Sequence, residues 1–184
     1  MKLVIVSGPE ATGKTMVGKK ISDMLGYPYQ SKDMIKEALF DTETRSTWDY
    51  SWYEDKAKDN FFNVIEQFIE HGTSAVIESN FIAEDRQRLT KCLNKDTLVS
   101  EIYCRTKGLT SFERFVRRNE GGARHKGHHD RRWYPTVLSQ DLLQYFGISW
   151  LHKPLGFSER LYIVDSTDFS KIDYEEIVDY IKEA

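Results

Sequence analysis

The stretch Gly8-Pro9-Glu10-Ala11-Thr12-Gly13-Lys14-Thr15 decides the fold of this chain, because it matches the pattern GxxxxGK[ST] at every position. It lies between an expected first strand, Leu3–Ser7, and an expected first helix, Lys14–Leu25. Gly8 and Gly13 permit backbone angles that a side chain would forbid, so successive N–H groups can point at phosphate oxygens. The amino end of the helix adds positive potential at the same place. The stretch therefore predicts a cradle for the phosphates of ATP, in which Lys14 reaches the β- and γ-phosphates and Thr15 binds Mg²⁺.

Short apolar strands alternate with amphipathic helices along the rest of the chain. The expected strands are Tyr27–Gln30, Ala75–Ile77, Leu98–Cys104 and Leu161–Val164, and the expected helices are Asp33–Phe40, Trp52–His71, Glu84–Asn94, Thr110–Asn119, Tyr134–Phe146 and Asp173–Lys182. This alternation predicts a three-layer α/β fold, with a central parallel sheet of about five strands and helices on both faces. Because no repeat or flexible linker interrupts the pattern, we expect one domain over residues 1–184.

The composition is that of an ordinary globular protein. The chain has 184 residues, of which 40% are hydrophobic and 30% charged, with a formal net charge of -3. These values exclude a disordered chain and a uniformly basic nucleic-acid binder. The two cysteines lack any metal-ligand spacing, and the first apolar run ends after four residues, too few for a signal peptide. We therefore expect a cytoplasmic protein with no membrane contact and no obligate protein partner.

Three further motifs accompany the phosphate cradle: Ser31–Glu37 after the second strand, Val76–Phe81 at the end of the third, and a basic stretch from Phe112 to Arg132. With these motifs, the chain from Leu3 to about Thr167 resembles the small P-loop kinases of the nucleoside-monophosphate-kinase type. Similar proteins include the kinase domain of phage polynucleotide kinase, chloramphenicol phosphotransferase and zeta toxins. The resemblance implies an ATP- and Mg²⁺-dependent kinase with the P-loop kinase fold and a mobile lid.

The guanine-binding motif of GTPases is not matched. In Asn94-Lys95-Asp96-Thr97 the aspartate comes one position too early for the pattern Asn-Lys-x-Asp. Guanine recognition by that route is therefore not predicted.

For the Ser31–Glu37 motif, the resemblance implies that Asp33 accepts the proton of an acceptor hydroxyl and that Lys36 helps to hold the substrate. A carboxylate near a helix N-terminus is well placed to orient a hydroxyl for in-line attack on the γ-phosphoryl group. The alternative is that Asp33 only caps the helix that follows it.

For the Val76–Phe81 motif, the resemblance implies the Walker B position, where an acid helps to hold Mg²⁺ and its water shell. Glu78 stands where an aspartate is commoner, which leaves open whether it contacts the metal directly or through water. Asn80 is a candidate substrate residue that could point into the acceptor pocket. The alternative is that Glu78 only ends a strand.

The stretch from Arg114 to Arg132 carries a net charge of +5 in an otherwise acidic chain. The resemblance implies that residues of about 120–132 form a lid whose closure brings guanidinium groups onto the transferring phosphoryl and excludes water. We expect Arg117 and Arg124 to be catalytic and Arg114 and Arg118 to contact the nucleotide. The alternative is a solvated basic loop.

Three histidines of this stretch, His125, His128 and His129, have no cysteine beside them and fit no standard zinc spacing. Basic lid residues or substrate contacts are the favoured interpretation. After the last strand, the resemblance implies that Asp165, Ser166 and Thr167 form a turn near the adenine of ATP.

The acceptor is the least determined part of the prediction. Residues 47–53, Thr47-Trp48-Asp49-Tyr50-Ser51-Trp52-Tyr53, hold four aromatic side chains that could line an acceptor pocket or could simply pack a helix onto the sheet. The acceptor hydroxyl could belong to a small molecule, a nucleoside or a nucleic-acid 5′-end. Two alternatives to a small-molecule kinase remain: a regulatory protein that binds ATP without transferring phosphate, and a kinase of nucleic-acid ends.

Overall fold

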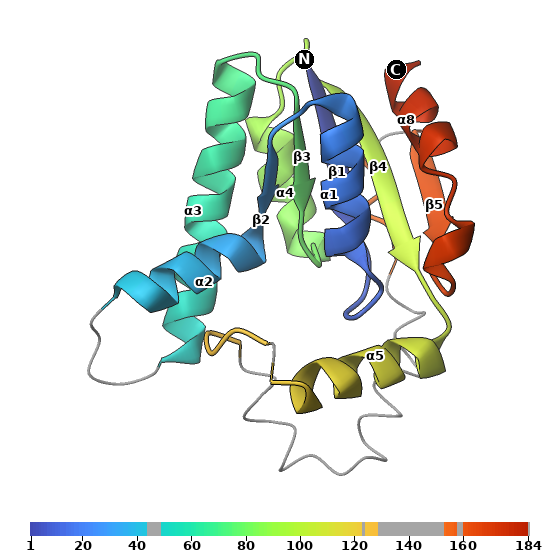
Figure 1. Ribbon diagram of the computed structural model, residues 1–184. Coiled ribbons are helices and arrows are strands. Elements are labelled where there is room, and N and C mark those ends of the chain that lie inside the picture. The colour runs from blue at the N-terminus through green and yellow to red at the C-terminus, as the bar shows by residue number, and fades with distance from the viewer. Residues whose placement is uncertain (44–48, 123, 129–152, 158–159, 184) are drawn as a thin grey trace.

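Five parallel strands form the central sheet of the protein (Figure 1). The computed structural model describes residues 1–43, 49–122, 124–128, 153–157 and 160–183. The strands lie in the order β2-β3-β1-β4-β5. Their bounds are β1 Lys2–Ser7, β2 Tyr29–Ser31, β3 Ala75–Glu78, β4 Leu98–Arg105 and β5 Leu161–Asp165. The predicted parallel α/β sheet is confirmed, and β1, which leads into the phosphate cradle, is its middle strand.

Helices cover both faces of this sheet, because successive side chains of a strand point to opposite sides. Val4 and Val6 of β1 pack with α1 and α8, while Leu3 and Ile5 pack with α3 and α4. The helices are α1 Lys14–Leu25, α2 Lys32–Thr42, α3 Tyr50–Glu70, α4 Ala83–Cys92, α5 Gly108–Glu120 and α8 Tyr174–Lys182, with a short 3-10 helix, η2, at Phe169–Lys171. The arrangement has the three layers that the alternation of strands and helices predicts.

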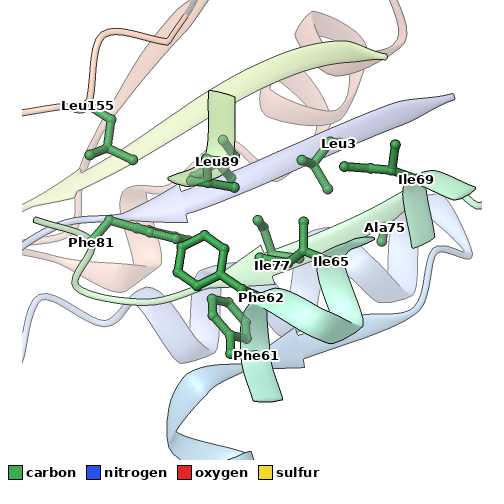
Figure 2. Packing of buried hydrophobic residues seen from close by; sticks show 11 residues of the cluster. Leu3, Phe61, Phe62, Ile65, Ile69, Ala75, Ile77, Phe81, Leu89 and Leu155 are labelled. Carbon is green, nitrogen blue, oxygen red and sulfur yellow. The ribbon is translucent and has the colours of Figure 1, made fainter. Parts of the chain in front are cut away.

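Side chains of α3 pack against β3, the strand that ends at Glu78, in the core on this face of the sheet (Figure 2). Phe61 and Ile65 of α3 are one turn apart and fully buried beside Ile77 of β3. The rings of Phe61 and Phe62 meet nearly edge to face, with centroids 6.1 Å apart. Burying side chains of this size stabilises the fold by about 1.5–3 kcal/mol each. This packing holds β3, and with it Glu78 at its end, in a fixed position.

Two helices, α2 and α5, lie beyond the carboxyl ends of the strands (Figure 1). α2 begins after Ser31, whose hydroxyl accepts the N–H of Met34 at 3.1 Å. Ser31 is therefore the N-cap of α2, and Asp33 is the second residue of the helix. The capping alternative for Asp33 is thus ruled out, and its carboxylate is available for another role.

The observed elements agree with the expected ranges to within a few residues, except that the helix expected over residues 134–146 lies outside the described part of the chain. Within the described residues, no helix is both long and apolar enough to cross a membrane.

Candidate functional site

A cavity of about 410 Å³ opens at the carboxyl ends of the strands. We call the part lined by the phosphate cradle, Glu78 and α5 the nucleotide half, and the part lined by α2, the start of α3, Arg124 and His128 the acceptor half. The lining residues are Glu10, Ala11, Gly13, Lys14, Thr15, Met16, Lys32, Asp33, Lys36, Tyr50, Glu54, Glu78, Asn80, Arg114, Arg118, Arg124 and His128. Binding sites of open parallel sheets lie at this edge.

The two glycines of the cradle cannot be replaced without a clash. Gly8 has φ 140° and Gly13 has φ 85°, both in the left-handed region. A Cβ at Gly8 would lie 2.2 Å from the carbonyl oxygen of Cys104, and a Cβ at Gly13 would lie 2.4 Å from the ring of Phe169. The cradle is therefore wedged between β4 and η2, so its N–H groups are held in place.

Lys14 lies folded into its own loop. Its Nζ donates a hydrogen bond to the carbonyl oxygen of Pro9 at 2.7 Å, and the Thr12 hydroxyl donates to the same oxygen at 2.8 Å. Lys14 is buried, with 7% of its surface exposed, and it lines the cavity. A phosphate oxygen entering the cradle would offer this ammonium group a charged partner in place of a carbonyl.

Thr15, Glu78 and Tyr29 form one hydrogen-bonded group at the floor of the cavity. The hydroxyls of Thr15 and Tyr29 both donate to Glu78 Oε2, at 3.1 Å and 2.9 Å. Burial raises the pKa of Glu78 above its ordinary value, against the lowering effect of Lys14. A hydroxyl and a carboxylate are oxygen ligands of the kind that Mg²⁺ prefers, so the Thr15–Glu78 pair fits a magnesium site. Tyr29 was not identified from the sequence, where nothing marks it as different from a core tyrosine.

Arg114 links α5 to the turn after β5. Its Nη2 donates to the carbonyl oxygens of Ser166 and Thr167 at 2.8 Å and 3.1 Å, and its guanidinium lies 3.9 Å from the centre of the Phe169 ring. The hydroxyl of Ser166 donates to the carbonyl oxygen of Thr12 in the cradle. The predicted turn therefore contacts the cradle through Ser166, whereas Asp165 accepts the N–H of Thr167 and closes the turn itself.

The arginines of α5 divide between two faces. Arg114 and Arg118 are four residues apart and line the cavity, while Arg117 is exposed and is not among its lining residues. The sequence-based expectation that Arg117 is catalytic has no support from this placement, because one residue of helix rotates the side chain by about 100° away from Arg118. Arg118, expected to contact the nucleotide, lines the cavity at the neighbouring position.

Asp33 lies in the other half of the cavity between two cations. Its carboxylate oxygens are 3.8 Å from Lys36 Nζ and 3.7 Å from an Nη atom of Arg124, and the carboxylate is half-exposed. Burial would raise the pKa of Asp33, but the positive charges of Lys36, His128, Arg124 and Lys32 outweigh it and hold the pKa below its ordinary value. Asp33 is therefore ionised and able to accept a hydrogen bond from a hydroxyl.

Glu54 of α3 fixes the lysines beside Asp33. Lys36, buried at 4% exposure, donates to Glu54 Oε2 at 3.1 Å, and Lys32 pairs with Glu54 Oε1. Burial opposes the charge of Glu54, yet the two lysines lower its pKa. The sequence did not identify Lys32 or Glu54, because the pairing joins positions about twenty residues apart.

Residues 124–128 lie along the acidic side of α2. His128 Nε2 is 2.7 Å from Glu37 Oε1, and His125 Nε2 is 3.3 Å from Asp41 Oδ1. With the Arg124–Asp33 contact, these pairs engage three carboxylates spaced four residues apart on one face of the helix. We call this set of three contacts the α2 clasp. Two of the three histidines considered in the sequence are thus partners of carboxylates.

The remaining residues singled out in the sequence lie in or near the cavity or outside the described part of the chain. Of the aromatic residues at 47–53, Tyr50 lines the cavity and Tyr53 is buried against Phe40 and Trp52. Tyr50 therefore has the position expected of a pocket residue, whereas Tyr53 packs the start of α3 against α2. Asn80 lines the cavity as expected. The remainder, Thr47, Trp48, His129, Asp130, Arg131 and Arg132, lies outside the described residues.

The arrangement brings together a phosphate cradle, a magnesium-type oxygen pair, two arginines of α5 and an ionised carboxylate. The carboxylate, that of Asp33 on α2, lines the same cavity as the cradle. This set contains groups that can bind a nucleoside triphosphate and a group that can orient a hydroxyl. Direct phosphoryl transfer requires both.

Comparison with known proteins gives a family and a set of structural neighbours. The model of the family described as an AAA domain matches residues 3–133. No protein with a curated description matches the sequence. Among solved structures, a candidate kinase from Chloroflexus aurantiacus J-10-fl is 26% identical, with 99% of this chain and 94% of that one covered and a TM-score of 0.81.

Two further neighbours share the fold at lower identity. A gluconokinase from Sinorhizobium meliloti 1021 is 17% identical, with 98% and 88% covered and a TM-score of 0.55. A shikimate kinase from Bacteroides thetaiotaomicron is 12% identical, with 100% and 95% covered and a TM-score of 0.57. The protein therefore has the fold of P-loop kinases, which are nucleotide-binding phosphotransferases.

Proposed function

This chain belongs to the AAA-domain family, and within that family we propose that it is a kinase acting as a single domain. It transfers the γ-phosphoryl group of ATP, with Mg²⁺, to a hydroxyl of a small molecule or of a nucleoside or nucleic-acid end. The observation that carries the proposal is that ionised Asp33 and the Lys14 cradle line one and the same cavity. The finer resemblance to polynucleotide kinase, chloramphenicol phosphotransferase and zeta toxins stays a prediction.

The residues divide the reaction between them. Lys14 exchanges the carbonyl oxygen of Pro9 for the β- and γ-phosphates. Thr15 and Glu78 hold Mg²⁺, which when bound neutralises charge on the phosphate oxygens. The acceptor oxygen forms a bond to the γ-phosphorus while the bond from phosphorus to the ADP oxygen breaks. Asp33 takes the hydroxyl proton.

The arginines act on the charge that spreads over the transferring group. Arg118 approaches from α5 and Arg124 from the far side, beside Asp33. Fixed donors of this kind stabilise charge that develops in the transition state without having to reorganise. Arg114 serves the nucleotide instead, because its contacts are with the turn after β5 and with Phe169.

We favour a small hydrophilic acceptor over a nucleic-acid end. The acceptor half of the cavity is lined by charged side chains from α2 and α3, with Tyr50 beside Lys36, and by Arg124 and His128 of the α2 clasp. Two neighbours of the same fold are named as a gluconokinase and a shikimate kinase, both kinases of small hydroxylated molecules by their names. A nucleic-acid acceptor would show itself by a steep dependence of affinity on salt.

The test is Mg²⁺-dependent release of ADP from ATP over a panel of acceptors: sugars and sugar acids, nucleosides, aminoglycosides and 5′-hydroxyl oligonucleotides. The Lys14→Ala variant is the blank. We expect one acceptor class to raise ADP release far above the rate without acceptor, and the increase to vanish in the blank. ATP binding with no acceptor effect in any class would instead support the regulatory ATP-binding protein.

A further inference from the structure

Tyr29 takes part in the site although it lies outside every motif of the sequence. It is the first residue of β2, and its hydroxyl donates to Glu78 Oε2 at 2.9 Å. The Thr15 hydroxyl donates to the same oxygen at 3.1 Å. Three elements, β2, β3 and α1, are therefore joined at one carboxylate oxygen on the floor of the cavity.

The register of the sheet brings the tyrosine to this point. In the β2–β3 pairing Tyr29 is the partner of Val76, and Glu78 follows Val76 by two residues on the same strand. Side chains two residues apart in a strand share a face. The side chains of Tyr29 and Glu78 are thus on the same face, the one that α1 covers, and the long tyrosine side chain spans the diagonal between them.

Gly18 makes room for the ring of Tyr29 on α1. A Cβ at Gly18 would lie 2.9 Å from the ring atom Cε2 of Tyr29, closer than a real contact allows. Glycine inside a helix is destabilising relative to alanine. Its presence in the second turn of α1 is explained by the tyrosine packed against it.

The hydrogen bonds from Tyr29 and Thr15 restrict the orientation of the Glu78 carboxylate. Glu78 has one more side-chain rotor than an aspartate, so its carboxylate needs more restraint to keep one orientation. Within the described residues, both hydrogen bonds to Glu78 go to Oε2. Oε1 is then the oxygen left for a metal ion or its water. Because Thr15 spends its proton on Glu78, its oxygen lone pairs are available for the same ion.

We propose that Tyr29 is a positioning residue for the magnesium site, holding Glu78 in the orientation in which it and Thr15 receive Mg²⁺ with the nucleotide. This inference rests on the proposed nucleotide site. It predicts that loss of the hydroxyl weakens the metal-dependent part of nucleotide binding and leaves the metal-independent part unchanged.

The test is calorimetric titration with ADP, once with Mg²⁺ and once with excess EDTA, on the wild type and on Tyr29→Phe. We expect Tyr29→Phe to weaken binding with Mg²⁺ by about five-fold, as for the loss of one typical intramolecular hydrogen bond. Binding in EDTA should be unchanged. Tyr27→Phe is the matched control, because Tyr27 is a neighbouring, partly buried tyrosine packed on the same core cluster.

The outcomes separate the inference from the function beneath it. If the wild type binds ADP no more tightly with Mg²⁺ than with EDTA, the proposed magnesium site itself is wrong. If the wild type shows the Mg²⁺ effect and Tyr29→Phe retains it in full, the role of Tyr29 is wrong. Equal weakening with Mg²⁺ and with EDTA would show a merely structural tyrosine. Adding Tyr29→Phe to Glu78→Gln should have almost no further effect, because the two act as one unit.

Discussion

His128 Nε2 lies 2.7 Å from Glu37 Oε1, which fixes the buried histidine of residues 124–128 to the middle of α2. The same helix carries Asp33 one turn earlier, where it meets Arg124. The α2 clasp thus sets the position of one proposed catalytic arginine relative to the proposed base. Asp33 lies on α2, and Arg124 is held against the same helix. Changes in the clasp should therefore weaken binding of the acceptor more than binding of ATP.

Removing the charge of Glu37 tests this dependence. In Glu37→Gln the hydrogen bond with His128 can persist but is no longer made to a charged oxygen, and we expect the KM for the acceptor to rise by about three- to ten-fold. The KM for ATP should change by less than two-fold. Glu43→Gln, an exposed position just past the end of α2, is the control. Equal increases in both KM values would show that the clasp does not act on the acceptor half alone.

The clasp should also respond to pH. Burial lowers the pKa of His128 below its ordinary value of 6.5, with Arg124 and Lys36 acting in the same direction and Asp33 and Glu37 opposing them. A lowered pKa means that His128 binds a proton more readily when its contact with Glu37 is broken than when the contact is made. The clasp is therefore fully stable above pH 6.5 and weakens as the pH falls through the lowered pKa.

We expect the KM for the acceptor to increase on acidification from about pH 7 to pH 5, with the KM for ATP nearly constant. His128→Gln should flatten this dependence, because it keeps a hydrogen-bond donor and does not titrate. Since the pKa of Asp33 is held below its ordinary value of 3.8, the base itself should stay ionised over this range. An acceptor KM that is independent of pH in the wild type would contradict the role given to His128.

Two arginines on α5 offer a matched comparison. Arg114 contacts Ser166, Thr167 and Phe169, whereas Arg117 is exposed away from the cavity. We expect Arg114→Ala to raise the KM for ATP about ten-fold, because both the turn after β5 and the ring beside the cradle lose their support. Arg117→Ala should change it less than two-fold. Steady-state kinetics measures both, and a larger effect at Arg117 would reverse the assignment of the two faces.

The elements that a local pattern marks could be predicted from the sequence. The string Gly8 to Thr15 carries its own backbone requirements, and the periodicity of α3 follows from one apolar face. Asp33 was identified as the base only through the family resemblance. In the sequence, its place near the start of α2 is also compatible with a capping role, and its partner Arg124 lies far away in the sequence.

The contacts that join distant positions could not be predicted. Tyr29 meets Glu78 across 49 residues of sequence, and His128 meets Glu37 across 91. No local signal marks such pairs, because each partner alone is compatible with an ordinary core or surface role. Arg117 illustrates a finer reason: composition identifies a basic helix, but only the rotation of α5 decides which arginines face the cavity.

The central claim is that Asp33 is the base of a kinase, and the most direct test is acceptor-dependent ADP release by Asp33→Asn. Asn is nearly isosteric but cannot take the hydroxyl proton, and Asp55→Asn, at an exposed position of α3, is the control. We predict that Asp33→Asn lowers kcat by at least 100-fold with ATP affinity unchanged, while Asp55→Asn keeps most of the wild-type kcat. A kcat for Asp33→Asn within a few-fold of wild type would contradict the account.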